Sequence, residues 1–214
     1  MKFHIVPVTP YMQNCSILVC PDTHEAAFVD PGGDVDVLVA KVVSLGVTPT
    51  KIFLTHGHMD HISGAKALSE HYSIPIEGAH EDEKMLFESL PIWCQNVGFP
   101  HVDSFLPDRW LTQGDVIEFG NQTLDVYFCP GHTPGHVVFV HQGIKTAWVG
   151  DVLFQGSIGR TDFPGGDHQT LISSITQTLW PLGDDIQFVP GHGPMSSFGQ
   201  ERRTNPFVSD TVFG

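Results

Sequence analysis

Thr55-His56-Gly57-His58-Met59-Asp60-His61 directly follows a short apolar segment, residues 51–54, that predicts a buried strand. The stretch places four potential metal ligands within six residues: His56, His58, Asp60 and His61. The glycine at position 57 lets the backbone turn tightly between the first two histidines. Imidazole nitrogens and carboxylate oxygens suit Zn²⁺, Mn²⁺ and Fe²⁺. The stretch therefore predicts a metal site in a loop at the end of a strand.

Three more candidate ligands follow predicted strands and lie beside glycines. They are His132 in Pro130-Gly131-His132, Asp151 in Val149-Gly150-Asp151, and His192 in Pro190-Gly191-His192. Seven ligands exceed the needs of one tetrahedral zinc but suit two metals about 3.5–4 Å apart, bridged by a carboxylate and a water. That water would lose a proton near neutral pH and attack as a metal-bound hydroxide. We expect Asp60 and Asp151 to be the catalytic carboxylates of such a site.

Strand patterns dominate the chain and occur in two groups that are separated by helical patterns. We predict strands at residues 16–20, 26–30, 51–54, 74–76, 123–128, 137–141, 146–149 and 187–189, and helices at residues 34–45, 61–71, 81–89 and 169–179. On the first helix, Val43 is expected on the apolar face. Residues 91–110 show no clear period and predict a loop. A sandwich of two sheets with helices outside fits this order, as one α+β domain over residues 1–214.

Composition narrows the function classes. The chain has 10 Lys and Arg against 24 Asp and Glu, a net charge of −14, so nucleic acid and anionic membranes are unfavourable partners. No leader peptide or membrane span is apparent. The four cysteines (Cys15, Cys20, Cys94 and Cys129) form no CxxC pair and predict reduced, buried thiols. We expect a cytoplasmic protein that is a monomer or a weak oligomer.

The motif His56-x-His58-x-Asp60-His61, with His132, Asp151 and His192, resembles the metallo-β-lactamase superfamily. The resemblance implies a four-layer αββα sandwich of two mixed sheets flanked by helices. It implies that His56, His58 and His132 hold one metal, that Asp60, His61 and His192 hold a second, and that Asp151 bridges them. Asp30, before Pro31, matches an early acidic position that supports the ligands by hydrogen bonding, or is a simple turn residue.

Within that superfamily the chain is similar to single-domain bacterial glyoxalase II, the hydroxyacylglutathione hydrolases. The likeness rests on residues 156–164, on Pro190-Gly191-His192-Gly193-Pro194 and on Asn205-Pro206-Phe207. It implies two divalent metals, with zinc expected and iron or manganese as alternatives. The implied partner is a small-molecule thioester, and the implied reaction converts S-D-lactoylglutathione and water to D-lactate and glutathione. We expect no counterpart, after His192, of the helical domain with which longer relatives bind glutathione.

Several assignments stay open at the level of sequence. Arg160 falls where larger relatives carry a glutathione-contacting lysine, so it binds a substrate carboxylate or pairs with Asp162. His136 supports a ligand or is an ordinary strand histidine. Four aromatic residues line the pocket mouth or pack in the core: Trp93, Phe99, Phe105 and Trp110.

Other activities on the same scaffold remain alternatives. A persulfide dioxygenase would hold one iron at the positions of His56, His132 and Asp151. A lactonase or β-lactamase would differ in pocket shape. The negative charge disfavours a nuclease. A non-catalytic scaffold is disfavoured because every ligand position is filled.

Overall fold

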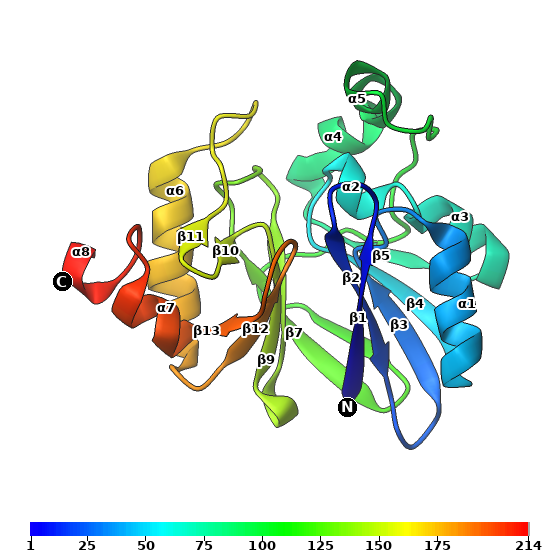
Figure 1. The fold of residues 1–214 in the computed structure, drawn as a ribbon, viewed down its shortest axis with the longest axis horizontal. Coiled ribbons are helices and arrows are strands. Elements are labelled where there is room, and N and C mark those ends of the chain that lie inside the picture. The colour runs from blue at the N-terminus through cyan, green and yellow to red at the C-terminus, as the bar shows by residue number, and fades with distance from the viewer. Residues whose placement is uncertain (214) are drawn as a thin grey trace.

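Two mixed β-sheets lie face to face in the computed structural model, which describes residues 1–213, and helices cover their outer faces (Figure 1). The first sheet has the order β1-β2-β3-β4-β5, with bounds Lys2–Val8, Gln13–Val19, Glu25–Val29, Thr48–Leu54 and Ile76–Gly78. Strands β1 to β3 pair antiparallel, whereas β3, β4 and β5 run parallel. This pairing confirms the expectation that the sheet is mixed, with both parallel and antiparallel neighbours.

The second sheet has the order β13-β12-β9-β8-β7-β6, in which only β9 and β12 are parallel neighbours. The bounds of β6 to β9 are Val116–Phe119, Gln122–Phe128, Val137–His141 and Thr146–Gly150, and those of β12 and β13 are Gln187–Pro190 and Ser196–Ser197. A separate hairpin of β10 (Leu153–Phe154) and β11 (Ser157–Ile158) follows β9.

Helices pack on the outer face of each sheet. Beside the first sheet lie α1 (Val35–Leu45), α2 (Met59–Ile62), α3 (Ala65–Tyr72), α4 (Lys84–Glu88) and α5 (Leu90–Val97). Beside the second lie α6 (His168–Ser173), α7 (Phe198–Thr204) and α8 (Asp210–Phe213). Short 3₁₀ segments occur at Glu81–Glu83, Gln142–Ile144 and Trp180–Leu182. Within residues 1–213, every helix is too short or too polar for a transmembrane span.

The core follows from strands that are apolar on both faces. Along β4, Phe53 points between the sheets, whereas Ile52 and Leu54 point toward α1 and α3. Along β8, Phe139 faces the space between the sheets and Val140 faces the second helical layer. Successive side chains point to opposite faces of a strand, so a continuous apolar run fills two layers of core at once.

Several predicted elements differ from the structure. Residues 91–110, predicted as a loop, begin with α5, because Pro91 is tolerated in a first helical turn and Leu90 and Cys94 supply a buried face. The predicted helix 61–71 is two helices, α2 and α3, which are interrupted where the Gly64 N–H donates to the Pro31 carbonyl at 2.8 Å. Helix α6 continues as a π-helix over Ser174–Leu179. Val43, expected on the buried face of α1, is 74% exposed.

Candidate metal centre

Four strand ends and one short helix bring the seven predicted ligands together at one edge of the sandwich. His56 and His58 follow β4, and Asp60 and His61 lie in α2. The other three ligands, His132, Asp151 and His192, follow β7, β9 and β12. The first sheet thus supplies four of the ligands and the second sheet supplies three, so the site spans both layers.

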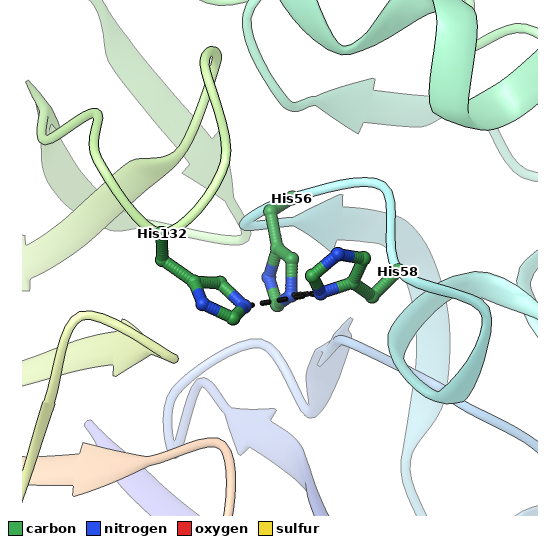
Figure 2. Close-up of side chains that lie close together, drawn as sticks. All are labelled: His56, His58 and His132. Carbon is green, nitrogen blue, oxygen red and sulfur yellow. Dashed lines mark hydrogen bonds between the residues drawn. The ribbon is translucent and has the colours of Figure 1, made fainter. Parts of the chain in front are cut away.

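One group consists of three imidazoles that point toward a common centre (Figure 2). The distance from His58 Nδ1 to His56 Nε2 is 3.1 Å, and from His58 Nδ1 to His132 Nε2 it is 3.0 Å. His58 Nδ1 carries either one hydrogen or one lone pair, so only one of these two contacts can be a full hydrogen bond. The remaining lone pairs face one another, which is the arrangement that a cation stabilises.

Hydrogen bonds at Nδ1 fix the tautomer and the ring orientation of His56 and His132. His132 Nδ1–H donates to the Arg160 carbonyl at 2.7 Å. The Thr55 hydroxyl donates to Asp30 Oδ2 at 2.6 Å and therefore accepts from His56 Nδ1 at 3.0 Å. Both Nε2 atoms are left as lone-pair donors. Burial together with the neighbouring imidazoles lowers the pKa of His56 well below its usual value and that of His58 to about 3, so both rings are neutral.

A second group consists of Asp60, His61 and His192, whose donor atoms lie within 4.8 Å of one another. His192 Nε2 lies 3.2 Å from Asp60 Oδ2, while His192 Nδ1–H donates to the Tyr11 carbonyl at 3.0 Å. His61 Nδ1 lies 2.9 Å from Asp30 Oδ2. The Asp30 carboxylate contacts His61 and Thr55 in this way, which leaves His61 Nε2 directed into the site.

Asp151 lies between the two groups. Its Oδ1 is 3.4 Å from His61 Nε2, and its Oδ2 is 3.6 Å from His132 Nε2 and 3.7 Å from His192 Nε2. Burial alone would raise the pKa of Asp151, but His61, His132 and His192 hold it well below its usual range. Its backbone N–H donates to His136 Nε2 at 3.1 Å, so His136 fixes the start of the loop after β9.

Two buried atoms test whether these residues fit a metal. His61 Nε2 and Asp151 Oδ1 are both buried and lie 3.4 Å from each other, but among the described residues neither has a partner in hydrogen-bond geometry. An unpaired buried polar atom is costly, and buried polar groups are normally satisfied. A divalent cation satisfies both atoms, and the set of five imidazoles and two carboxylates matches the ligands that such cations prefer. The residues therefore fit a metal centre.

The sequence pattern of the metallo-beta-lactamase superfamily matches residues 8–192. The chain belongs to this superfamily. It is similar to hydroxyacylglutathione hydrolase GloC of Haemophilus influenzae, with 47% identity over 210 residues, which are 98% of this chain and 99% of that protein. This superfamily member is an enzyme of the metal-dependent hydrolase class.

Two solved structures of the superfamily are similar to nearly the whole chain. The BLEG-1 B3 metallo-beta-lactamase has 37% identity and a TM-score of 0.90, and the match covers 97% of this chain and 99% of that one. TTHA1623 in a di-iron-bound form has 33% identity and a TM-score of 0.87, with coverage of 96% and 100%. The αββα sandwich is thereby established for this hydrolase.

Glu83 contacts two of the loops that carry ligands, and the sequence did not predict this role. Its side chain is fully buried, with Oε2 accepting from the Gly57 N–H and Oε1 from the Gly135 N–H, both at 2.6 Å. Burial raises the pKa of Glu83 to about 7, although the two N–H groups act in the opposite direction. Glu81-Asp82-Glu83-Lys84 looks like a charged surface turn, and no local signal points to partners 26 and 52 residues away.

A cavity of about 550 Å³ opens over the ligands of this hydrolase. Arg160 lines it, with Nε and Nη2 donating to Asp162 at 2.7 and 2.6 Å, so the predicted ion pair is present and the side chain also faces the cavity. Trp93 lines the cavity. Phe99, Phe105 and Trp110 pack against the core of the first sheet instead.

Proposed function

We propose that this enzyme hydrolyses thioesters at a centre of two divalent metals, with S-D-lactoylglutathione as substrate and D-lactate and glutathione as products. The observation that carries the proposal is the position of Asp151, whose two oxygens lie between the two ligand groups. The similarity to GloC, named as a hydroxyacylglutathione hydrolase, supports the choice of substrate.

We assign His56, His58 and His132 to the first metal and Asp60, His61 and His192 to the second, with Asp151 bridging. Zinc is the metal we expect, since neutral imidazole and carboxylate are its usual ligands. The same ligands accept iron and manganese, and the structure of TTHA1623 is named as di-iron-bound. Supply of metal then decides which ion a given preparation contains.

Two bound divalent metals would polarise the thioester carbonyl and lower the pKa of a water between them. Asp60 is positioned to orient the attacking water, because its Oδ2 is held beside His192 and its pKa is lowered by the His192 hydrogen bond against the effect of burial. The water oxygen forms a bond to the carbonyl carbon, and the carbon–sulfur bond breaks. The thiolate needs no strong general acid, and the water's protons end on the thiol and in solvent.

The test is release of free thiol from S-D-lactoylglutathione by the purified protein. We expect His58→Ala to abolish most of the rate, because His58 Nδ1 lies within 3.1 Å of both other imidazoles of its group. His71→Ala is the matched control, since His71 is exposed and lies outside the cavity. A metal analysis of the same sample should give two ions per chain.

Two outcomes would overturn parts of the proposal. One iron per chain with oxygen uptake on glutathione persulfide would replace the hydrolase by a dioxygenase. Two metals with hydrolysis of a lactone or a β-lactam, but not of the thioester, would keep the hydrolase and overturn the substrate. A cytoplasmic setting also belongs to this proposal and is supported by the four cysteines, which are free and buried.

A further inference from the structure

One wall of the cavity is a continuous apolar stripe along two consecutive helices. Leu86 of α4 and Leu90, Trp93 and Val97 of α5 are spaced by four, three and four residues, and all four line the cavity. The spacing places Leu90, Trp93 and Val97 on one face of α5, and Leu86 of α4 lines the same cavity. Trp93 is half-buried and Val97 is 47% exposed, so the stripe extends from the interior to the rim.

The opposite wall is also apolar. Phe154 of β10, Ile158 of β11 and Phe163 in the loop after β11 line the cavity there. The Phe163 ring lies 5.4 Å from the His58 ring and 6.2 Å from the Trp93 ring, edge to face in both cases. Phe163 thus contacts a predicted metal ligand on one side and the stripe on the other, so the apolar space begins directly beside the reacting centre.

Positive charge is scarce around this space. Arg160 is the one lysine or arginine among the described residues that line the cavity. Its guanidinium is exposed, is paired with Asp162, and lies 4.0 Å from the centroid of the Phe163 ring. Glutathione carries two carboxylates, and neither can be placed against the apolar walls without a large desolvation cost. The polar part of a glutathione thioester therefore belongs at the Arg160 rim or in solvent.

We propose that the apolar part of the cavity, which the stripe and Phe163 both line, binds the acyl group of the substrate, and that the enzyme prefers thioesters of bulky apolar acyl groups, aromatic or branched, over the small lactoyl group. This proposal rests on the proposed thioester hydrolysis and specifies its substrate class. A lactoyl methyl group covers little of a cavity of about 550 Å³, whereas a phenyl ring buries apolar surface against Trp93 and Phe163.

The test compares two glutathione thioesters that differ only in the acyl side chain, S-D-lactoylglutathione and S-D-mandeloylglutathione. Both have the same 2-hydroxyacyl core and the same thiol, and dividing by the rate of hydroxide-catalysed hydrolysis removes their intrinsic difference in reactivity. We expect the corrected kcat/KM of the phenyl substrate to be higher by roughly tenfold or more. Corrected values that are equal would overturn the proposal.

Substitutions on α5 test whether the apolar stripe causes the preference for the phenyl substrate. We expect Trp93→Ala to bring the phenyl-to-methyl ratio of kcat/KM near one, while the neighbouring Ile92→Ala, whose side chain is 61% exposed and outside this cavity, keeps the wild-type ratio. Val97→Gln is a second variant at a partly exposed position, where a polar group enters the stripe without disturbing the core. An unchanged ratio in both Trp93→Ala and Val97→Gln would overturn the assignment.

Binding of the two products separates this inference from the proposed function. Calorimetry should show that mandelate binds the metal-loaded protein roughly tenfold more tightly than lactate, and that Trp93→Ala removes the difference. If mandelate binds more tightly than lactate but neither thioester is cleaved, the apolar acyl site is supported and the proposed thioester hydrolysis is overturned. If both thioesters are cleaved but mandelate binds no more tightly than lactate, thioester hydrolysis is supported and the apolar acyl site is overturned.

Discussion

Glu83 Oε2 accepts a hydrogen bond of 2.6 Å from the backbone N–H of Gly57, the residue between His56 and His58. The other carboxylate oxygen accepts an equally short bond from Gly135, in the loop between β7 and β8 that carries His132. One buried carboxylate therefore holds two ligand-bearing loops from different sheets at a fixed separation. Groups that orient metal ligands in this way affect metal affinity without touching the metal.

We expect Glu83→Gln to weaken metal binding by about tenfold or more, because the amide NH₂ faces a backbone N–H and one of the two loop contacts is lost. The measurement is competition for Zn²⁺ with a coloured chelator, done alongside thermal unfolding of the metal-free protein. The conservative shape of glutamine keeps the cavity filled, so the fold should persist.

Glu77→Gln is the matched control. Glu77 is also a buried carboxylate, but it pairs with Lys51 and Arg109 away from the ligands. We expect this substitution to lower thermal stability and to leave the zinc affinity at the wild-type value. Equal zinc affinities for the two variants would show that Glu83 contributes only to stability.

The pH dependence of stability provides a second prediction about Glu83. Its pKa is raised from 4.5 to about 7, so the folded state favours the protonated form. The resulting stabilisation is fully present below pH 4.5 and is lost as the pH rises through about 7, with an upper value of about 3 kcal/mol. For the metal-free proteins, the free energy of unfolding of wild type minus that of Glu83→Gln should therefore be larger at about pH 5 than at about pH 8. A difference that stays flat or grows with pH would contradict the raised pKa.

The sandwich could be predicted because its signals are local. Strands such as β4 and β8 are short apolar runs bounded by turn residues, and α1 ends at Gly46, which adopts a left-handed conformation. Helix α5 was missed because Pro91 and the aromatic residues after it obscure the helical spacing of its apolar residues. That spacing becomes clear only when the residues that face the cavity are known. The exposure of Val43 likewise depends on how α1 lies on its sheet.

The ligands could be proposed from the sequence because strand ends in a sandwich converge on one edge, and His132, Asp151 and His192 each stand beside a glycine after a strand. Glu83 and the apolar stripe could not be proposed. Their roles depend on pairings between residues far apart in the chain, such as Glu83 with Gly57, which are 26 residues apart, and Trp93 with Phe163. No periodicity encodes such pairings, which are set only when the two sheets pack.

Removal of metal should destabilise the protein. Two features are costly without a cation: the buried His61 Nε2 and Asp151 Oδ1, which have no hydrogen bond among the described residues, and the facing imidazoles of His56, His58 and His132. Ligands that bind only the folded state raise its stability by mass action, so micromolar Zn²⁺ should raise the melting temperature of chelator-treated protein by several degrees. The same titration on His58→Ala should give a smaller increase. A melting temperature that zinc leaves unchanged would argue against a structural fit between metal and site.

Gly191→Ala tests the packing beneath the ligands. A Cβ at position 191 would lie 2.1 Å from Asp151 Oδ1 and 2.6 Å from His61 Cε1, so it must displace the carboxylate that joins the two ligand groups. Misplacement of a reacting group by about 1 Å costs about a hundredfold in rate, and we expect a loss of about that size in kcat together with weaker zinc binding.

Gly114→Ala is the control for the general cost of replacing a glycine. Gly114 has a φ of +85° and nothing within 4 Å of the added carbon, so alanine there strains the backbone without reaching any ligand. We expect Gly114→Ala to lose about 1 kcal/mol of stability and to keep the wild-type kcat and zinc affinity. If Gly191→Ala behaves in the same way, Asp151 tolerates displacement and cannot be the residue that fixes the separation of the two ligand groups. A large loss of kcat in Gly191→Ala, together with an unchanged kcat in Gly114→Ala, would instead show that activity depends on the position of the Asp151 carboxylate.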